Sequence, residues 1–224
     1  MNSPVKTLPD SMQDRKYREL RDVLPDVSRE TFERLLAYEA LFNKWSKAIN
    51  LAAPSTMAEF WNRHVLDSAQ LAAIYEPSGI WVDIGSGGGL PGIVMAILLS
   101  ESSTGIIHLV ESNGKKAAFL RQALIETGGA GQVHLLRIED AYPKIGPAAV
   151  VTARALAPLP ALISLAHPWL RSGAKGLFHK GREYREEVKA ASDEWHLDLI
   201  EHQSTVDAAS AILEIRSASP RLSD

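Results

Sequence analysis

A short apolar run, a glycine-rich loop and a second apolar stretch follow one another over residues 80–101, and this unit constrains the fold more than any other part of the chain. The loop, VDIGSGGGLPG at 82–92, puts five of the 15 glycines into the eight positions from Gly85 to Gly92. Glycine loses more conformational entropy on folding than other residues, so such a cluster needs a structural reason. A turn alone needs one or two glycines. We therefore expect the backbone of this loop to approach a ligand closely.

From Ile80 onward, short apolar runs alternate with helical stretches. This alternation predicts an α/β fold in which helices cover both faces of a mostly parallel, seven-stranded sheet. The last two apolar runs have no long helix between them, which predicts an antiparallel final strand. The predicted strands are 80–84, 106–110, 133–137, 149–153, 175–179, 196–203 and 211–215, and the predicted helices between them are 91–101, 114–127 and 158–171.

The part of the chain before this sheet is divided into two segments. Residues 1–27 contain three prolines and little periodicity, so we expect them to be poorly structured. Residues 28–78 are expected to form a helical subdomain, because apolar residues recur at helical spacing over 28–51. Thr56, with Glu59 three residues later, offers a capping box for a second helix. Residues 79–224 form the α/β domain.

Composition excludes several classes of protein. The chain has no cysteine, which excludes disulfides, thiolate metal sites and cysteine nucleophiles and is consistent with a reducing cytoplasm. No apolar run approaches the 18 or so residues of a membrane span, so no membrane partner is expected. No cluster of His, Asp and Glu has the spacing of metal ligands, and we expect no metal. Because the net charge is −3, any surface that binds nucleic acid must be a local basic patch.

Two nucleotide cofactors fit the glycine loop. Gly87-x-Gly89-x-x-Gly92 has the spacing of the dinucleotide fingerprint, whereas Asp83-x-Gly85-x-Gly87 is the pattern of S-adenosyl-L-methionine (AdoMet) enzymes, in which the acid contacts the amino-acid part of the cofactor. Both need an acid after the second strand to hold ribose hydroxyls, and Glu111 stands there. Glu139 follows the third strand, where the adenine would lie. A dehydrogenase normally needs a further catalytic domain, and little chain remains for one, which favours AdoMet.

The chain resembles the G family of bacterial small-subunit ribosomal RNA methyltransferases (RsmG, also called GidB). The resemblance runs from about Leu35 to Gly181 and depends on seven segments in order. These are NKWSKAINL (43–51), RHVLDS (63–68), DIGSGGGLPGI (83–93), LVESNGKKAAFLRQA (109–123), RIEDA (137–141), TARALAPL (152–159) and HKG (179–181). The resemblance implies a Rossmann-like AdoMet-dependent methyltransferase fold. It also implies methylation of N7 of a guanine in a decoding-region loop of 16S rRNA, with 16S rRNA or the 30S subunit as the partner.

The resemblance implies cofactor contacts by position, at the glycine loop, after the third strand and after the fourth. At two positions the chain departs from the family, which often has serine where Ala153 stands and leucine or proline where His179 stands. Together with the acids above, the expected cofactor contacts are Asp83, Gly85, Gly87, Leu90, Glu111, Ile138, Glu139 and Arg154.

The chemistry of N7 methylation agrees with the residues that the chain offers. Guanine N7 already has an exposed lone pair, so its attack on a sulfonium methyl group needs no general base, and alignment of the reactants is the main task. We therefore expect no catalytic dyad or triad, and Arg154 is expected to act by positioning. Methylation of pyrimidine C5 uses a cysteine, which this chain lacks.

Five basic residues are candidates for contact with RNA. Arg154 is favoured as a contact to AdoMet or to an RNA phosphate, with a structural salt bridge as the alternative. Arg63 could pair with Asp67 four residues later, and the charged stretch 182–189 could equally be an ordinary solvated helix. The RNA candidates are Arg63, Lys115, Lys116, Lys180 and Arg182.

Two other functions remain open from the residues alone. The chain could be an AdoMet methyltransferase that acts on another RNA, a protein or a small molecule. It could also be a non-catalytic module that binds a nucleotide and a partner.

Overall fold

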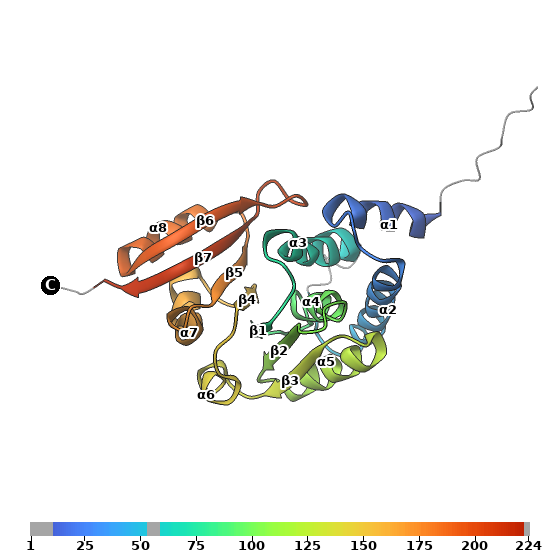
Figure 1. Ribbon diagram of the computed structural model, residues 1–224, viewed down its shortest axis with the longest axis horizontal. Coiled ribbons are helices and arrows are strands. Elements are labelled where there is room, and N and C mark those ends of the chain that lie inside the picture. Colours follow the sequence, from blue (N-terminus) through green and yellow to red (C-terminus); the bar gives the residue numbers. More distant parts are fainter. Residues whose placement is uncertain (1–10, 53–58, 222–224) are drawn as a thin grey trace, which may run out of the picture.

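The computed structural model describes residues 11–52 and 59–221, and a seven-stranded sheet runs through the middle of it (Figure 1). The strand order is β3-β2-β1-β4-β5-β7-β6, in which the first five strands are parallel and β7 is antiparallel to both of its neighbours. This confirms the predicted sheet. The strands are β1 Ile80–Ile84, β2 Ile106–Glu111, β3 Gly131–Leu135, β4 Val150–Arg154, β5 Lys175–Lys180, β6 Trp195–Gln203 and β7 Ala211–Pro220.

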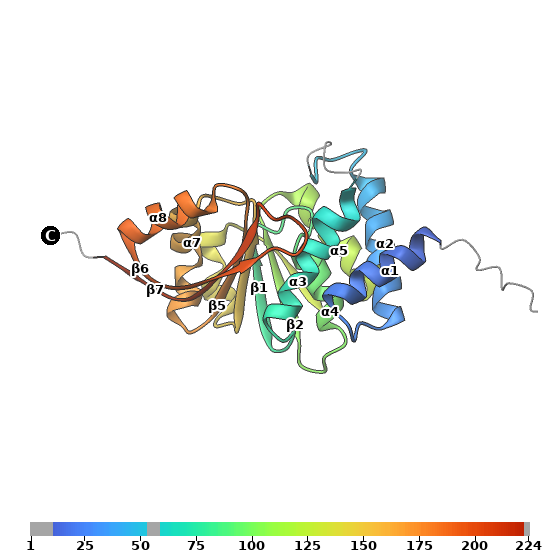
Figure 2. The same cartoon turned by 90° about the horizontal axis from the view of Figure 1, so that it is seen from above.

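Helices cover both faces of the sheet (Figures 1 and 2). Successive residues of a strand point to opposite faces, and in β1 both Trp81 and Val82 are fully buried, each in a different hydrophobic core. The first core is formed with α1 Met12–Val23, α2 Arg29–Trp45, the π-helical turn η2 Trp61–Leu66, α3 Asp67–Ile74, α4 Gly92–Leu99 and α5 Gly114–Thr127. The second is formed with α6 Tyr142–Ile145, α7 Leu159–Arg171 and α8 Tyr184–Glu194. A short 3-10 turn, η3 Ile138–Asp140, follows β3.

The expectation that residues 1–27 are poorly structured is wrong for the part that the structure describes. Ser11 caps helix α1 in a capping box with Asp14, and Lys16 forms an ion pair with Glu39 of α2 at 2.6 Å. Leu20 is fully buried and anchors α1 on the first core. The sequence signal is short, because the apolar residues that pack α1 on the first core, Tyr17, Leu20 and Val23, recur at helical spacing over only two turns.

The second predicted helix differs from a regular one. Chain 61–66 forms the π-helical turn η2, in which the Asp67 N–H donates to the carbonyl of Asn62, and α3 continues from it. The proposed capping box lies outside the described residues at Thr56. Helix α8 begins at Tyr184, within the charged stretch 182–189. For this stretch the sequence allowed either a solvated helix or a basic patch.

The glycine loop connects β1 to α4, and its glycines serve two physical needs. Gly85 has φ +68°, a left-handed conformation that favours glycine. Gly92 has an ordinary φ but no room, because a Cβ there would lie 2.4 Å from Leu109 Cδ2 and 2.5 Å from Asp83 Oδ2. The glycine at position 92 therefore allows α4 to pack closely against the strands. This need is separate from any approach of the loop to a ligand.

Replacing Gly92 by alanine is expected to destabilise the protein. The added methyl group overlaps two buried neighbours, so we expect a loss of about 1–3 kcal/mol in the free energy of unfolding. Urea denaturation followed by circular dichroism measures this change.

Gly114 is the matched control for this substitution. It lies at the start of α5, and a Cβ there would meet no atom within 4 Å. Gly114→Ala should therefore be neutral or stabilise the protein by up to about 1 kcal/mol. Equal stability of the Gly92→Ala variant and the wild type would contradict the packing argument.

Candidate active-site groove

Three adjoining cavities lie along the carboxyl ends of β1, β2, β4 and β5. The sheet order reverses between β1 and β4, and ligands of open α/β sheets bind at such a switch point. We name the cavities the first chamber (about 310 Å³, next to Glu111), the middle chamber (about 370 Å³, next to Leu90) and the outer chamber (about 420 Å³, next to Lys180). Ala155 lines all three, so they form one groove.

Glu111 fastens the glycine loop to the end of β2. Its Oε2 accepts a hydrogen bond from the Gly87 N–H at 2.8 Å, and its Oε1 accepts one from the Asn113 N–H at 2.7 Å. Each carboxylate oxygen has two lone pairs, so Glu111 can still accept hydroxyl donors from the first chamber, which it lines. This is the arrangement that holding a ribose requires.

The far end of the first chamber is formed by the chain that follows β3. Ile138 and Glu139 belong to η3 and line the chamber, with Ile138 half-buried and the Glu139 side chain exposed. An apolar side chain beside an exposed carboxylate suits a flat heterocycle with polar edges, such as adenine. The structure thus brings both residues to the first chamber, and their contact with adenine stays a prediction.

The glycine loop is also supported from behind by α2. The buried hydroxyl of Tyr38 donates to the carbonyl of Gly88 at 2.6 Å, and a Cβ on Gly88 would lie 2.8 Å from the Phe42 ring. The sequence gives no sign of this role of Tyr38, because an aromatic residue on the apolar face of a helix predicts only core packing.

Asp83 lies beneath the loop and is 1% exposed. Its Oδ1 accepts from the Thr152 hydroxyl of β4 at 2.8 Å, whereas its Oδ2 makes no hydrogen bond within the described residues. Burial raises the pKa of Asp83 to about 7. Asp83 does not line any of the three chambers, so it supports the loop and could meet the cationic part of a cofactor only from below.

Arg154, at the end of β4, is bound by the helical segment that precedes the sheet. Its Nη1 lies 3.2 Å from Asp67 Oδ2, and its Nη2 donates to the Arg63 carbonyl at 2.8 Å and to His64 Nδ1 at 2.7 Å. The alternative in which Arg63 pairs with Asp67 is not formed, because Asp67 faces Arg154 while Arg63 pairs with Glu59 at 3.6 Å. Arg154 thus forms a structural salt bridge with Asp67. It also lines the middle and outer chambers of the groove.

Two buried histidines beside Arg154 are held neutral. Burial, followed by the charge of Arg154, lowers the pKa of His64 to about 4, so its Nδ1 accepts from the guanidinium and its Nε2 carries the hydrogen. Burial also lowers the pKa of His179, whose Nε2–H donates to the Asp67 carbonyl at 2.9 Å. Neither histidine is charged at neutral pH, so the cations that line the middle and outer chambers are lysine and arginine.

Ala155 is the one described residue other than glycine with positive φ, at 50°. The left-handed conformation costs an L-residue about 1–2 kcal/mol, and such strain clusters at functional sites. Because Ala155 lies where the three chambers meet, the strain exposes backbone at the centre of the groove.

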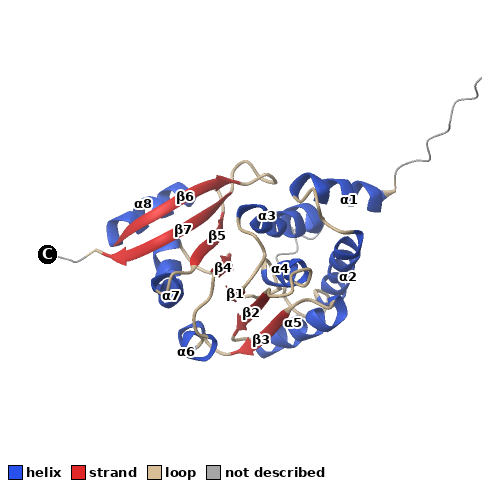
Figure 3. Ribbon diagram, in the orientation of Figure 1, coloured by secondary structure: helices blue, strands red, loops and turns tan. Residues whose placement is uncertain are grey.

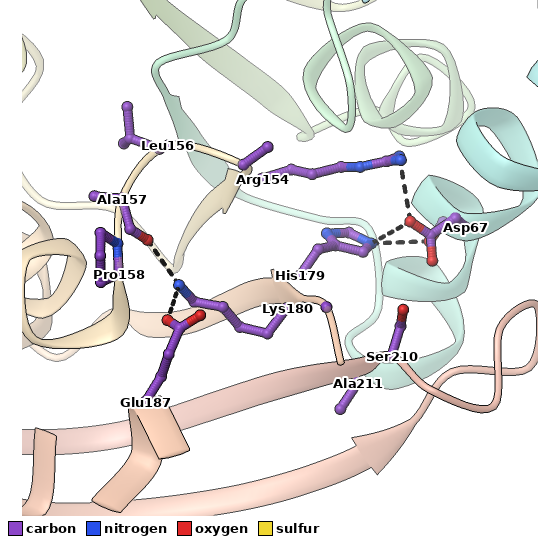
Figure 4. Close-up of a pocket in the computed structure, with 12 residues that line it drawn as sticks. Asp67, Arg154, Leu156, Ala157, Pro158, His179, Lys180, Glu187, Ser210 and Ala211 are labelled. Carbon is purple, nitrogen blue, oxygen red and sulfur yellow. Dashed lines mark hydrogen bonds and ion pairs between the residues drawn. The ribbon is translucent and has the colours of Figure 1, made fainter. Parts of the chain in front are cut away.

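Lys180, at the end of β5, is a buried cation on the wall of the outer chamber (Figure 4). Its Nζ donates to Glu187 Oε2 at 2.6 Å and to the Ala157 carbonyl at 2.7 Å, and its side chain is 7% exposed. Glu187 Oε2 also accepts from the Leu159 N–H at the start of α7. The sequence does not single out Glu187, because it is one of several glutamates in a charged stretch.

The other expected RNA contacts differ in where they lie. Lys116 is half-buried and lines the first and middle chambers, whereas Lys115 is exposed one residue earlier in α5. Arg63 and Arg182 are exposed, and the charges of both act on Asp207 in the β6–β7 loop. Both arginines therefore lie near enough to the β6–β7 loop to act on Asp207, although 119 positions separate Arg63 from Arg182 in the sequence.

The β6–β7 loop is pinned to α3 across the end of the sheet (Figure 3). Gln70 Oε1 accepts from the Thr205 N–H at 2.7 Å and from its hydroxyl at 2.9 Å. Gln70 Nε2 donates to Asp67 Oδ1 at 3.1 Å, which links this contact to Arg154. The sequence contains no motif that indicates this contact.

Within the ranges 11–52 and 59–221, no helix is long and apolar enough to cross a membrane. No group of three or more His, Cys, Asp or Glu residues in these ranges could hold a metal ion.

Comparison with known proteins extends these observations. A family model described as GidB, rRNA small subunit methyltransferase G, matches residues 31–215. The chain is 55% identical over 202 residues to the ribosomal RNA small subunit methyltransferase G of Brucella canis, covering 90% of this chain and 95% of that protein.

Solved structures share the fold at low sequence identity. An O-methyltransferase from Bacillus cereus, in complex with S-adenosylhomocysteine, is similar with a TM-score of 0.53 at 15% identity, over 89% of this chain and 96% of that chain. Aeropyrum pernix fibrillarin, with natively bound S-adenosyl-L-methionine, is similar with a TM-score of 0.51 at 18% identity, over 69% and 75%. The Rossmann-like methyltransferase fold expected from the sequence is confirmed.

The buried carboxyl of Asp83 makes a testable contribution to stability. Its pKa is about 7 in the folded state, against about 3.9 in an unfolded chain, so between these values only the folded state keeps the proton. The stability that this group contributes is present below about pH 4 and is lost as the pH rises to about 7. We expect the stability of the wild type, relative to Asp83→Asn, to fall between pH 5 and pH 8.

Urea denaturation of the wild type and of Asp83→Asn at pH 5 and pH 8 measures the difference in their free energies of unfolding. Other titrating groups are the same in both proteins, so their contributions cancel in this difference. A difference that is equal at pH 5 and pH 8 would show that Asp83 is ionised throughout.

Proposed function

This chain belongs to the GidB family of rRNA small subunit methyltransferases, and from that premise we propose that it transfers the methyl group of AdoMet to N7 of a guanine in 16S rRNA. The guanine is expected in a decoding-region loop of the small subunit. The observation that carries the proposal is a groove with a glycine loop and Glu111 at one end and Arg154 and Lys180 at the other.

The residues of the first and middle chambers fit AdoMet. Glu111 would accept the ribose hydroxyls, and Ile138 and Glu139 would flank the adenine. Gly85, Gly87 and Leu90 would line the part that holds the methionine. When bound, AdoMet supplies an electrophilic methyl group on a sulfonium. Asp83 and Tyr38 would act on this site indirectly, by holding the loop.

The chemistry asks the chain for alignment rather than for a proton acceptor. Guanine N7 attacks the methyl carbon with its own lone pair, so the charge moves from sulfur to the base and no proton leaves N7. The two histidines beside Arg154 suit this reaction, because they are neutral and hydrogen-bonded to protein groups instead of poised as bases. Arg154 would lie at the junction of the middle and outer chambers. Much of the rate enhancement would come from the orientation of guanine N7 relative to the methyl group.

The rim of the groove supports RNA as the substrate in spite of the net charge of −3. Lys115, Lys116, Arg63 and Arg182 lie around the chambers or exposed beside them, and cations of this kind contact phosphates. We propose the 30S subunit or its 16S rRNA as the partner, in the cytoplasm. A different RNA, a protein or a small molecule as methyl acceptor would be an outcome of the experiment below.

Methyl transfer from labelled AdoMet to 30S subunits and to free 16S rRNA tests the proposal. We expect label in 16S rRNA, at one guanine that primer extension locates after cleavage at N7-methylguanine. Subunits of the 50S class serve as the control and should remain unlabelled. If AdoMet binds but no RNA becomes labelled, the assignment of RNA as the substrate is wrong, whereas the assignment of AdoMet as the cofactor still stands.

Tyr38→Phe tests the support of the glycine loop. The substitution removes one hydroxyl that bonds to Gly88, so we expect AdoMet affinity to fall several-fold and stability to fall by about 0.5–1.5 kcal/mol. Calorimetry of AdoMet binding and urea denaturation measure the two effects. Tyr17→Phe is the control, because the Tyr17 hydroxyl makes a long 3.4 Å bond in the α1–α2 region, away from the loop.

A further inference from the structure

We propose that the Lys180–Glu187 ion pair recognises the Watson–Crick edge of the target guanine in the outer chamber. This inference depends on the proposed function, because it names the residues that select the base. It concerns the outer chamber. Of the expected AdoMet residues, Glu111, Ile138, Glu139 and Leu90 line only the other two chambers, and Arg154 alone is shared with this one.

Apart from Ser210, whose hydroxyl donates to Asp207, the polar side chains of the outer chamber are arranged in two separate clusters (Figure 4). Arg154, Asp67 and His179 form the first, at the junction with the middle chamber. Lys180, Glu187 and the Ala157 carbonyl form the second. A base bound between them would have one edge at the junction and the opposite edge at the ion pair.

The two edges of guanine match these two ends. N7 must face the junction, since the methyl group arrives from the middle chamber. N1 and the N2 amino group lie on the opposite side of the purine from N7, so they would face Lys180 and Glu187. Enzymes that act on an extruded base commonly hydrogen-bond its Watson–Crick edge.

The ion pair still has hydrogen-bonding capacity. Lys180 Nζ has three N–H donors and uses two of them, on Glu187 and Ala157. Glu187 Oε2 accepts from Lys180 and from Leu159 N, whereas its Oε1 makes no hydrogen bond within the described residues. One donor beside one acceptor oxygen is therefore available to a ligand.

This donor and acceptor are complementary to guanine and opposed to adenine. Guanine O6 accepts, and would take the third N–H of Lys180, while N1–H and N2–H₂ donate, and would both reach the two lone pairs of Glu187 Oε1. Adenine presents a donor at N6 and an acceptor at N1, so both contacts would be mismatched. A polar site left unpaired in this way rejects the wrong substrate strongly.

Stability alone does not account for the pair. A buried ion pair loses solvation that its attraction seldom repays, and an apolar pair of similar size is often as stable. Glu187 does bond the first N–H of α7, but a neutral acceptor would serve that contact equally well. Selection of the base explains why both members of the pair, Lys180 and Glu187, are charged.

The experiment compares guanosine with inosine, which lacks the N2 amino group. The substrates are 30S subunits reconstituted with 16S rRNA that carries either nucleoside at the methylated position, as located by primer extension. The wild type should methylate the inosine substrate with kcat/KM lower by on the order of 10-fold. Glu187→Gln should lower kcat/KM on guanosine by about 10- to 100-fold and reduce the guanosine-to-inosine ratio several-fold, because a charged hydrogen bond becomes a neutral one.

Glu187→Met removes the acceptor and should bring the guanosine-to-inosine ratio close to one. This ratio does not depend on how much of a variant is folded, so a structural defect alone leaves it unchanged. Glu186→Gln, an exposed neighbour on α8, is the matched control and should retain the wild-type ratio. AdoMet affinity by calorimetry should stay within about 2-fold in all variants, because Glu187 does not line the cofactor chambers.

Equal methylation of guanosine and inosine by the wild type would overturn the inference, as would a wild-type ratio in Glu187→Met. Absence of methylation of the guanosine substrate by the wild type would instead overturn the proposed function, and with it the base contact.

Discussion

The ion pair between Asp67 and Arg154 is the contact on which the groove depends. It joins the start of α3 to the end of β4 at 3.2 Å, and so fixes the helical segment against the carboxyl edge of the sheet. The π-helical turn before α3 contributes the Arg63 carbonyl and His64 to the same guanidinium. Because α3 also holds the β6–β7 loop through Gln70, the walls of the middle and outer chambers are positioned together.

The glycine loop is held by groups on three sides, and these groups lie so close to its backbone that larger residues would not fit. Glu111 bonds its backbone from β2, Tyr38 bonds it from α2, and Leu156 lies so close to Gly85 that a Cβ there would approach to 2.6 Å. A loop fixed in this way loses little further entropy when a cofactor binds. Preorganisation of this kind strengthens binding without additional contacts.

Much of the fold could be predicted from the sequence, because its elements carry strong local signals. Every predicted strand is present in the sheet, six of them within about two residues at each end, whereas β7 continues to Pro220, five residues beyond its predicted end. The antiparallel arrangement at the end of the sheet is confirmed. Helix α1 was missed, because its core-facing residues Tyr17, Leu20 and Val23 extend over only two turns among charged residues. For the candidate site, the residues after β1, β2 and β3 reach the first two chambers as expected, since parallel strands place their carboxyl ends at one edge.

By itself the sequence determined the order of strands and helices, the position of the ligand loop and the family, because each depends on residues close together in the chain or on segments in a fixed order. Only the tertiary structure decided how the charged residues pair. Asp67 meets Arg154 across 87 positions instead of Arg63 across four, and Lys180 turns inward to Glu187. Long charged side chains can reach several partners, so spacing in the sequence does not determine which ion pair forms. Burial and the packing of distant elements determine it.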